Sequence, residues 1–181
     1  SVVNVSGDDI PAFKFNQNNA KLYGIEASLD IHPHPLDWLH FENSFSYVNA
    51  TQRDQPDSAR YLPSIPPAKW SSELKATAGK VGNIFSNAYA MVEFENYWAQ
   101  NRFYSAFNTE TATPGYAILN MGIGADVISK KGATLFSLFI NANNITDVAY
   151  QSHLSRLKYA DINNVTGRTG VYNMGRNISF K

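Results

Sequence analysis

The sequence contains no cysteine among its 181 residues, so disulfide bonds and thiolate metal sites are excluded for this chain. Charged side chains are also scarce, at 17%, against about 25% in an average soluble domain. The fifteen basic and fifteen acidic residues balance to a net charge of zero. A nucleic-acid-binding surface is normally strongly basic, so nucleic acid is not an expected partner.

Long apolar runs are missing as well. No stretch approaches the roughly 20 apolar residues that a membrane helix requires. Transmembrane strands remain open, because they need only about 9–11 residues and alternate in polarity instead of running apolar. The chain is 44% hydrophobic and 13% aromatic. This composition is compatible with a β-rich protein that does not present all of its surface to water.

Alternation of apolar and polar residues is the main pattern that the sequence does have. Thr134, Phe136, Leu138 and Ile140 share one side of an extended chain, while Ser137 lies on the other. Period-2 alternation predicts a strand with one apolar and one more polar face. The same alternation predicts about eight strands in all. The others are expected at 11–15 (the end of an incoming strand), 20–31, 36–50, 68–79, 84–98, 115–128 and 171–181.

The connections between these strands alternate in length. Short turns are expected at 32–36, 79–83 and 129–132, and long loops at 51–67, 99–114 and 151–170. An antiparallel meander therefore has its short turns at one end and its long loops at the other. Most of the strands are about 11–15 residues long, against a mode of about 5–6 in soluble sheets. This pattern is typical of an outer-membrane β-barrel, and the alternative is a large soluble β-sandwich or a lipocalin-like barrel.

Five short motifs follow one another along nearly the whole chain, and each is weak alone. They are residues 19–26 (NAKLYGIE), 62–67 (LPSIPP), 116–120 (YAILN), 141–150 (NANNITDVAY) and 175–177 (GRN). In this order they resemble the C-terminal part of the barrel of TonB-dependent outer-membrane receptors. Ile145 stands where the family usually has Leu. The loop segment 152–156 (SHLSR) resembles receptors of Bacteroidetes-type bacteria.

The resemblance implies a fold, a role and partners. Family barrels have about 22 strands around an N-terminal plug, so residues 1–181 are expected to be the C-terminal third, with the plug and the TonB-coupling box absent. The implied role is active uptake of a scarce nutrient: a ferric siderophore, haem, cobalamin or a glycan. The implied partners are outer-membrane lipid, the TonB complex through the N-terminal part, the nutrient ligand and, as a further candidate, a surface lipoprotein. No enzymatic activity and no cofactor are implied.

A second hypothesis is an autonomous eight-stranded barrel that acts as an adhesin or binding module. Such a barrel needs its first and last strands to close on each other and its interior to be filled by side chains. Gly24, Gly122 and Gly124 all fall on the predicted lumen face and are expected to leave it poorly filled. This favours an arc of a wide barrel over a small closed one.

Candidate functional residues come from the long loops. Zinc sites need three or four convergent ligands, and no spacing of histidines and acids offers them; no nucleophile elbow is present either. No catalytic or metal residue is therefore predicted. Aromatic and arginine side chains in loops suit many ligands, and the expected ligand-facing set is Arg53, Arg60, Trp98, Arg102, Tyr104, Phe107, His153, Arg156 and Tyr159.

Aromatic side chains near the expected strand ends form a separate group. Amphipathic rings suit the level of the lipid headgroups, and ordinary core packing is the alternative. The group consists of Trp38, Tyr47, Trp70, Tyr97, Trp98 and Tyr116.

Overall fold

The computed structural model describes residues 2–5, 8–11 and 18–181. These residues form two antiparallel sheets. The smaller sheet is a hairpin of β1 (Val2–Val5) and β2 (Asp8–Pro11). Most of the incoming strand that the sequence predicts at 11–15 lies outside the described residues.

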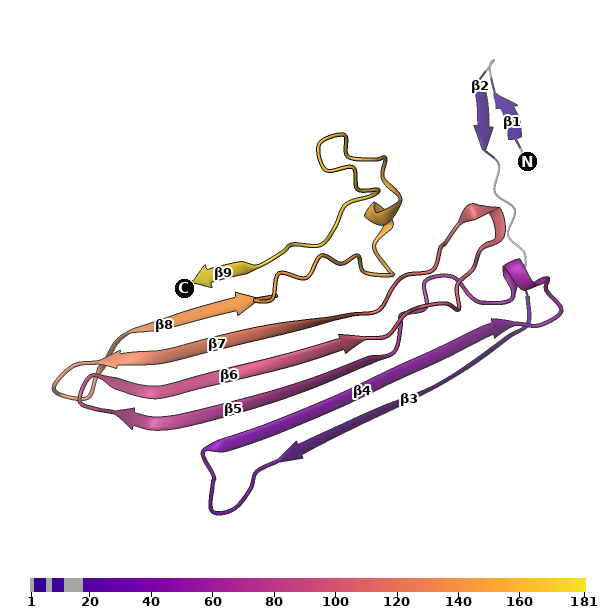
Figure 1. Cartoon of the computed structure of the whole chain (residues 1–181). Helices are drawn as coiled ribbons and strands as arrows, with labels where there is room; N and C mark the ends of the chain where they lie inside the picture. The colour runs from indigo at the N-terminus through magenta and orange to yellow at the C-terminus, as the bar shows by residue number, and fades with distance from the viewer. Residues whose placement is uncertain (1, 6–7, 12–17) are drawn as a thin grey trace.

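The larger sheet has seven strands in the order β3-β4-β5-β6-β7-β8-β9. Figure 1 shows them side by side in one open sheet, with short turns at one end and the long loops at the other. Because β3 and β9 lie at opposite edges, the sheet is not closed on itself. This confirms the prediction of an all-β antiparallel arc. The strands are β3 (Ala20–Ile31), β4 (Leu39–Gln52), β5 (Lys69–Val81), β6 (Phe85–Tyr97), β7 (Tyr116–Ile128), β8 (Thr134–Asn143) and β9 (Asn177–Phe180).

In the described part of the chain, helix occurs only in the long loops. The described helical segments are three short 3₁₀ turns: η1 (Asp57–Ala59), η2 (Ala106–Asn108) and η3 (Arg156–Tyr159). None of the described helices is long and apolar enough to cross a membrane.

The last strand is shorter than the sequence predicts. The pattern indicates a strand over 171–181, but β9 begins only at Asn177. The amides of Val171 and Asn173 donate instead to carbonyls of the preceding loop, over 2.8 and 2.9 Å. An amide that is bonded in this way cannot join the β8 ladder, so the first half of the expected strand belongs to the loop.

One face of the seven-stranded sheet is apolar across its whole width. Residues directly opposite each other in neighbouring strands share a face, and the pairs Phe45 with Trp70 and Leu74 with Val92 are examples. Exposed apolar residues on this face are Ile25, Leu29, Phe41, Leu74, Val92, Phe94, Met121, Ile123, Leu138 and Ile140. An antiparallel sheet in water packs its apolar face on a core. Among the described residues this face has no covering layer, so it requires an apolar surrounding.

The opposite face is polar and carries a row of carboxylates. Asp30, Glu42, Glu73 and Glu93 are successive cross-strand partners on β3 to β6, and Asn120 continues the row on β7. Like charges placed directly opposite each other destabilise a sheet unless water or a partner solvates them. Glu93 is solvated within the sheet, since it accepts hydrogen bonds from the Asn120 amide at 3.0 Å and from a serine hydroxyl. This face is suited to water, as in the lumen of a barrel.

The glycines of the polar face do not leave it empty. A Cβ atom on Gly124 would lie 2.5 Å from ring atoms of both Tyr89 and Phe139, whose ring centroids are 6.3 Å apart. A Cβ on Gly122 would meet the side chains of Asn141 and Met91. At Gly122 and Gly124 the expectation of a poorly filled face is therefore wrong, because each makes room for larger side chains of the neighbouring strands.

Candidate functional site at the long-loop end

Three loops stand at the end of the sheet that faces away from the short turns (Figure 1). We call them the first loop (53–68), the second loop (98–115) and the third loop (144–176). Together they hold all nine residues of the ligand-facing set that the sequence predicts. Hydrogen bonds connect the second loop to both of the others, so the loops form one connected surface.

Gln100 joins the first and second loops. Its side chain is buried, and its amide nitrogen donates to the carbonyls of Ile65 and Pro66 over 3.0 and 3.1 Å. Its amide oxygen accepts from the backbone of Arg102. Proline has no N–H, so the proline-rich segment offers carbonyl acceptors, and the second loop supplies the matching donor. The LPSIPP motif of the sequence therefore has a structural role, because its carbonyls accept hydrogen bonds from the second loop.

Replacing Gln100 by alanine tests this connection. The change removes the donor of two hydrogen bonds and leaves the carbonyls of the first loop without their partner, which is expected to cost about 1–2 kcal/mol of stability. Limited proteolysis of the whole protein checks the result, because cleavage within 53–68 and 98–115 should become faster. Unchanged cleavage would show that the two loops do not depend on this side chain.

Glu110 is a second connection between the same loops. Its carboxylate accepts hydrogen bonds from the backbone amides of Ser64, at 2.7 Å, and Tyr104, at 3.1 Å. The turn η2 lies between Tyr104 and Glu110 in the chain, and it leaves Phe107 with 94% of its surface exposed. The backbone φ of Phe107 is 58°, a left-handed conformation that is uncommon for a bulky residue. The surrounding bonds thus hold an aromatic ring out from the loop surface.

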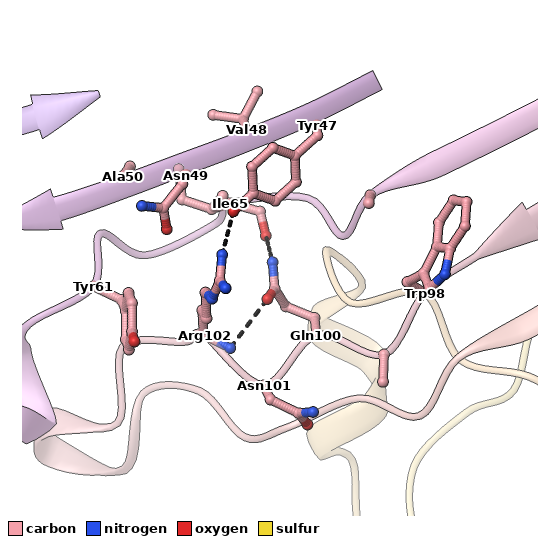
Figure 2. Close-up of a pocket in the computed structure, with 12 residues that line it drawn as sticks. Tyr47, Val48, Asn49, Ala50, Tyr61, Ile65, Trp98, Gln100, Asn101 and Arg102 are labelled. Atoms are coloured by element: carbon pink, nitrogen blue, oxygen red, sulfur yellow. Dashed lines mark hydrogen bonds between the residues drawn. The ribbon is translucent and has the colours of Figure 1, made fainter. Parts of the chain in front are cut away.

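A cavity of about 370 Å³ lies where the first and second loops meet the end of β4. Figure 2 shows Arg102 directed at the hydroxyl of Tyr47, with Tyr61 and Trp98 on the surrounding walls. Arg102 donates to that hydroxyl, and its guanidinium lies 5.9 Å from the Tyr47 ring centroid. The cavity therefore combines a cation, aromatic faces and the amide of Asn49, which suits a ligand with anionic or planar groups.

The second and third loops meet at three buried polar side chains, Thr113, His153 and Lys158, which we call the loop junction. The His153 Nδ1 atom lies 2.8 Å from the Thr113 hydroxyl and 3.4 Å from the Lys158 ammonium. Lys158 also donates to the Thr113 hydroxyl at 2.8 Å. Burial, together with the positive charge of Lys158, lowers the pKa of His153 below its ordinary value. His153 is thus a buried structural contact in this arrangement.

Three tyrosines stack at the loop end of the polar face. The ring centroids of Tyr97 and Tyr116 are 4.6 Å apart, and those of Tyr116 and Tyr150 are 4.3 Å apart. Tyr97 shares its face with Glu95, two residues away, and donates to its carboxylate. The sequence places Tyr97 and Tyr116 at the lipid headgroups, and this is wrong because both rings lie on the polar face. Trp98 does lie on the apolar side, edge-on to Phe45.

The third loop brings two of the sequence motifs into contact. The Asn144 side chain accepts from the backbone amide of Val148 and donates to its carbonyl, each over 2.9 Å. Asp147 accepts from the backbone amide of Arg176 at 2.9 Å. A Cβ on Gly175 would lie 2.5 Å from the Asp147 carboxylate, so a larger residue there would displace the carboxylate from its position. The NANNITD and GRN motifs therefore act together to hold the chain that leads into β9.

The remaining residues of the predicted set are placed as follows. Tyr159 accepts a hydrogen bond from the Thr111 amide, which links the third loop to the second. The structure leaves Arg53, Arg60 and Arg156 exposed to solvent. Sequence reasoning missed Gln100, Thr113 and Lys158, which connect the loops to one another. It also missed Tyr150, which stacks the third loop on Tyr116 at the start of β7. No periodic signal marks a polar residue that is buried by a distant loop. The described residues hold no group of three or more His, Cys, Asp or Glu side chains placed to bind a metal ion.

Comparison with known proteins addresses the family directly. Residues 1–145 match the sequence model described as TonB dependent receptor-like, beta-barrel. The chain belongs to this family. No curated protein sequence matches it. Among solved structures, the copper transporter OprC is similar with a TM-score of 0.66 and 18% sequence identity, and the match covers 90% of this chain and 23% of that chain.

At this identity the likeness to OprC shows the fold, and this chain spans only 23% of the length of that chain. The matched family model describes a receptor barrel and covers 145 of the 181 residues. The open seven-stranded sheet is consistent with part of such a barrel.

Proposed function

We propose that the chain forms part of the wall and of the extracellular vestibule of an outer-membrane receptor, which takes up a scarce nutrient with energy from the TonB complex. The observation that carries the proposal is the pair of sheet faces. An apolar face crosses all seven strands and has no covering layer within the part of the chain that the structure describes, and a row of carboxylates occupies the other face. A wall between lipid and a water-filled lumen needs this combination.

The rest of the receptor follows from the family. Residues 1–181 form the C-terminal part of its barrel, and a plug with a TonB-contacting segment belongs to the N-terminal part. The protein is not an enzyme. A surface lipoprotein, where one is present, would contact the exposed ends of the loops. The open sheet supports part of a larger barrel over an autonomous small barrel, because β3 and β9 are on opposite edges.

The nutrient is bound by the loop surface, through Trp98 and Arg102 in the cavity and through other residues of the three loops. These other residues are Arg53, Arg60, Tyr104, Phe107, Arg156 and Tyr159. His153 does not contact the nutrient itself but is buried beneath this surface, where it contacts Thr113 of the second loop. A cation beside aromatic rings suits a ferric siderophore, haem, cobalamin or a glycan. The test is uptake by cells that produce the whole receptor, with each of these four nutrient classes supplied in turn as the limiting source. One class should support growth only when both the receptor and TonB are present, and growth independent of the receptor for all four contradicts the proposal.

Removing the cation and the ring of the cavity should weaken ligand binding. The double variant Trp98→Ala with Arg102→Gln loses the cation–π and hydrogen-bonding groups, and we expect a rise in Kd of about tenfold, equivalent to about 1.4 kcal/mol. Binding of the nutrient identified by uptake is measured on the whole receptor. The matched control is Arg168→Gln, because Arg168 lies 5.1 Å from the Tyr172 ring centroid but outside the cavity. An equal loss in both variants would count against the cavity.

A further inference from the structure

The loop junction joins two loops through a cation and an imidazole that are both buried. Thr113 belongs to the second loop, and His153 and Lys158 belong to the third. The exposed fractions of the three side chains are only 5%, 5% and 7%. Lys158 also donates to the Thr111 carbonyl at 3.2 Å, so its ammonium contacts the second loop twice. This junction therefore decides how the second and third loops lie relative to each other.

The contacts of His153 select its neutral form. The Lys158 ammonium has only donors to offer, and it faces the Nδ1 atom at 3.4 Å. The Nδ1 atom must therefore carry a lone pair, and the proton of the neutral ring lies on Nε2. Nε2 is buried and has no hydrogen-bond partner among the described residues. A neutral imidazole is thus the form that the closed junction requires.

Protonation of His153 would place two cations side by side in this buried position. Lys158 faces the ring from the same loop, and Glu110 is the charged group that acts on it from the second loop. The Glu110 carboxylate has the weaker effect and is already bonded to two backbone amides. The ring of Tyr159 is a further neighbour, and its centroid lies 4.9 Å from the Lys158 ammonium. Repulsion between His153 and Lys158 therefore dominates the protonated state.

We propose that the loop junction is a pH-sensitive connection, which holds the second and third loops together at neutral pH and lets them separate in acid. Separation would move Arg102 and Phe107 away from the third loop. The effect on nutrient capture rests on the proposed function, whereas the movement itself does not.

The direction of the pH dependence follows from linkage. The pKa of His153 is lower in the closed junction than the ordinary value of 6.5 that it regains in solvent. Well above pH 6.5 His153 is neutral in both states, and the closed state keeps its full stability. As the pH falls below 6.5, the separated state takes up the proton first, and the ratio of closed to separated loops falls by up to about tenfold per pH unit. The fall stops once the pH is below the pKa of the closed state.

Distance measurement between the loops tests the proposal. Phe107 and Val165 are each 94% exposed, one in the second loop and one in the third. Spin labels on Phe107→Cys and Val165→Cys in the whole receptor report their separation by pulsed electron paramagnetic resonance. A single distance at pH 7.5 should be joined by a longer one at pH 5, and the change should reverse on return to pH 7.5. No change in the labelled parent protein would overturn the proposal.

Two variants assign the response. His153→Gln cannot titrate, so its distances should be the same at both pH values, whether the loops stay closed or stay apart. The control His34→Gln, with a side chain 86% exposed in a short turn, should keep the full response. A response that survives in His153→Gln would refute the role of the loop junction. Because the measurement needs no nutrient, a receptor that imports none of the four classes would sink the proposed function and leave this test intact.

Discussion

Replacing Leu74 by arginine is expected to lower both the stability of the receptor and the amount of it that reaches the folded state in the outer membrane. Leu74 lies midway along β5 on the apolar face, opposite Phe41 on one side and Val92 on the other. An arginine on the lipid face near the membrane midplane costs about 2–4 kcal/mol. The amount of folded receptor in outer-membrane fractions, and urea unfolding of the receptor in lipid vesicles, measure the effect.

A second leucine provides the control. Leu157 in the third loop is 60% exposed, more than the 46% of Leu74. In water the two positions would tolerate arginine about equally, with changes within about 0.5 kcal/mol. In a membrane only Leu74 meets lipid, so the Leu157→Arg variant should give the same amount of folded receptor in outer-membrane fractions as the parent protein. Equal behaviour of the two variants would show that the apolar face has some other covering.

Alanine at Asn144 is expected to cost about 3 kcal/mol of unfolding free energy. Asn144 is 3% exposed and has a φ of 49°, in the left-handed region that costs most residues about 1–2 kcal/mol. Its side chain makes two hydrogen bonds with Val148 and one with the carbonyl of Met174, at 3.4 Å. Alanine loses these bonds and also strains the backbone. Urea unfolding of the whole receptor in vesicles gives the free energy.

Glycine at the same position separates the two causes. Glycine adopts a positive φ without a steric penalty, so Asn144→Gly should lose only the hydrogen bonds, about 1–2 kcal/mol. The alanine variant should therefore be less stable than the glycine variant. Equal stability of the two would mean that the backbone conformation is not a source of strain at this turn.

Strand alternation predicts much of this fold because each strand has one apolar and one polar face. Residues 20–31 are predicted and observed with the same limits, and 115–128 differs from β7 by one residue. The prediction fails for 171–176, where the residues remain compatible with a strand. The backbone amides of Val171 and Asn173 donate to carbonyls of the third loop instead, and no local pattern contains that information.

The loop contacts were less predictable for the same reason. The sequence predicts that His153 faces the ligand because it lies in a long loop, but it is buried against Thr113, which is 40 residues away in the chain. Lys158 is equally ordinary in the sequence and equally buried. Burial at such positions is decided by where another loop lies, and that depends on the whole sheet. The motif residues Asn144 and Asp147 were easier, since turn chemistry favours Asn and Asp locally.

The strand order also bears on how the sheet folds. Every strand of the larger sheet pairs only with the strands before and after it in the chain. Contacts between segments close in sequence form fastest, because less chain entropy is lost in closing a short loop. The hairpins β5–β6 and β7–β8, with their short turns, are therefore the natural nuclei, and the sheet can grow from them one strand at a time. The short β9, beyond the long third loop, is expected to join last.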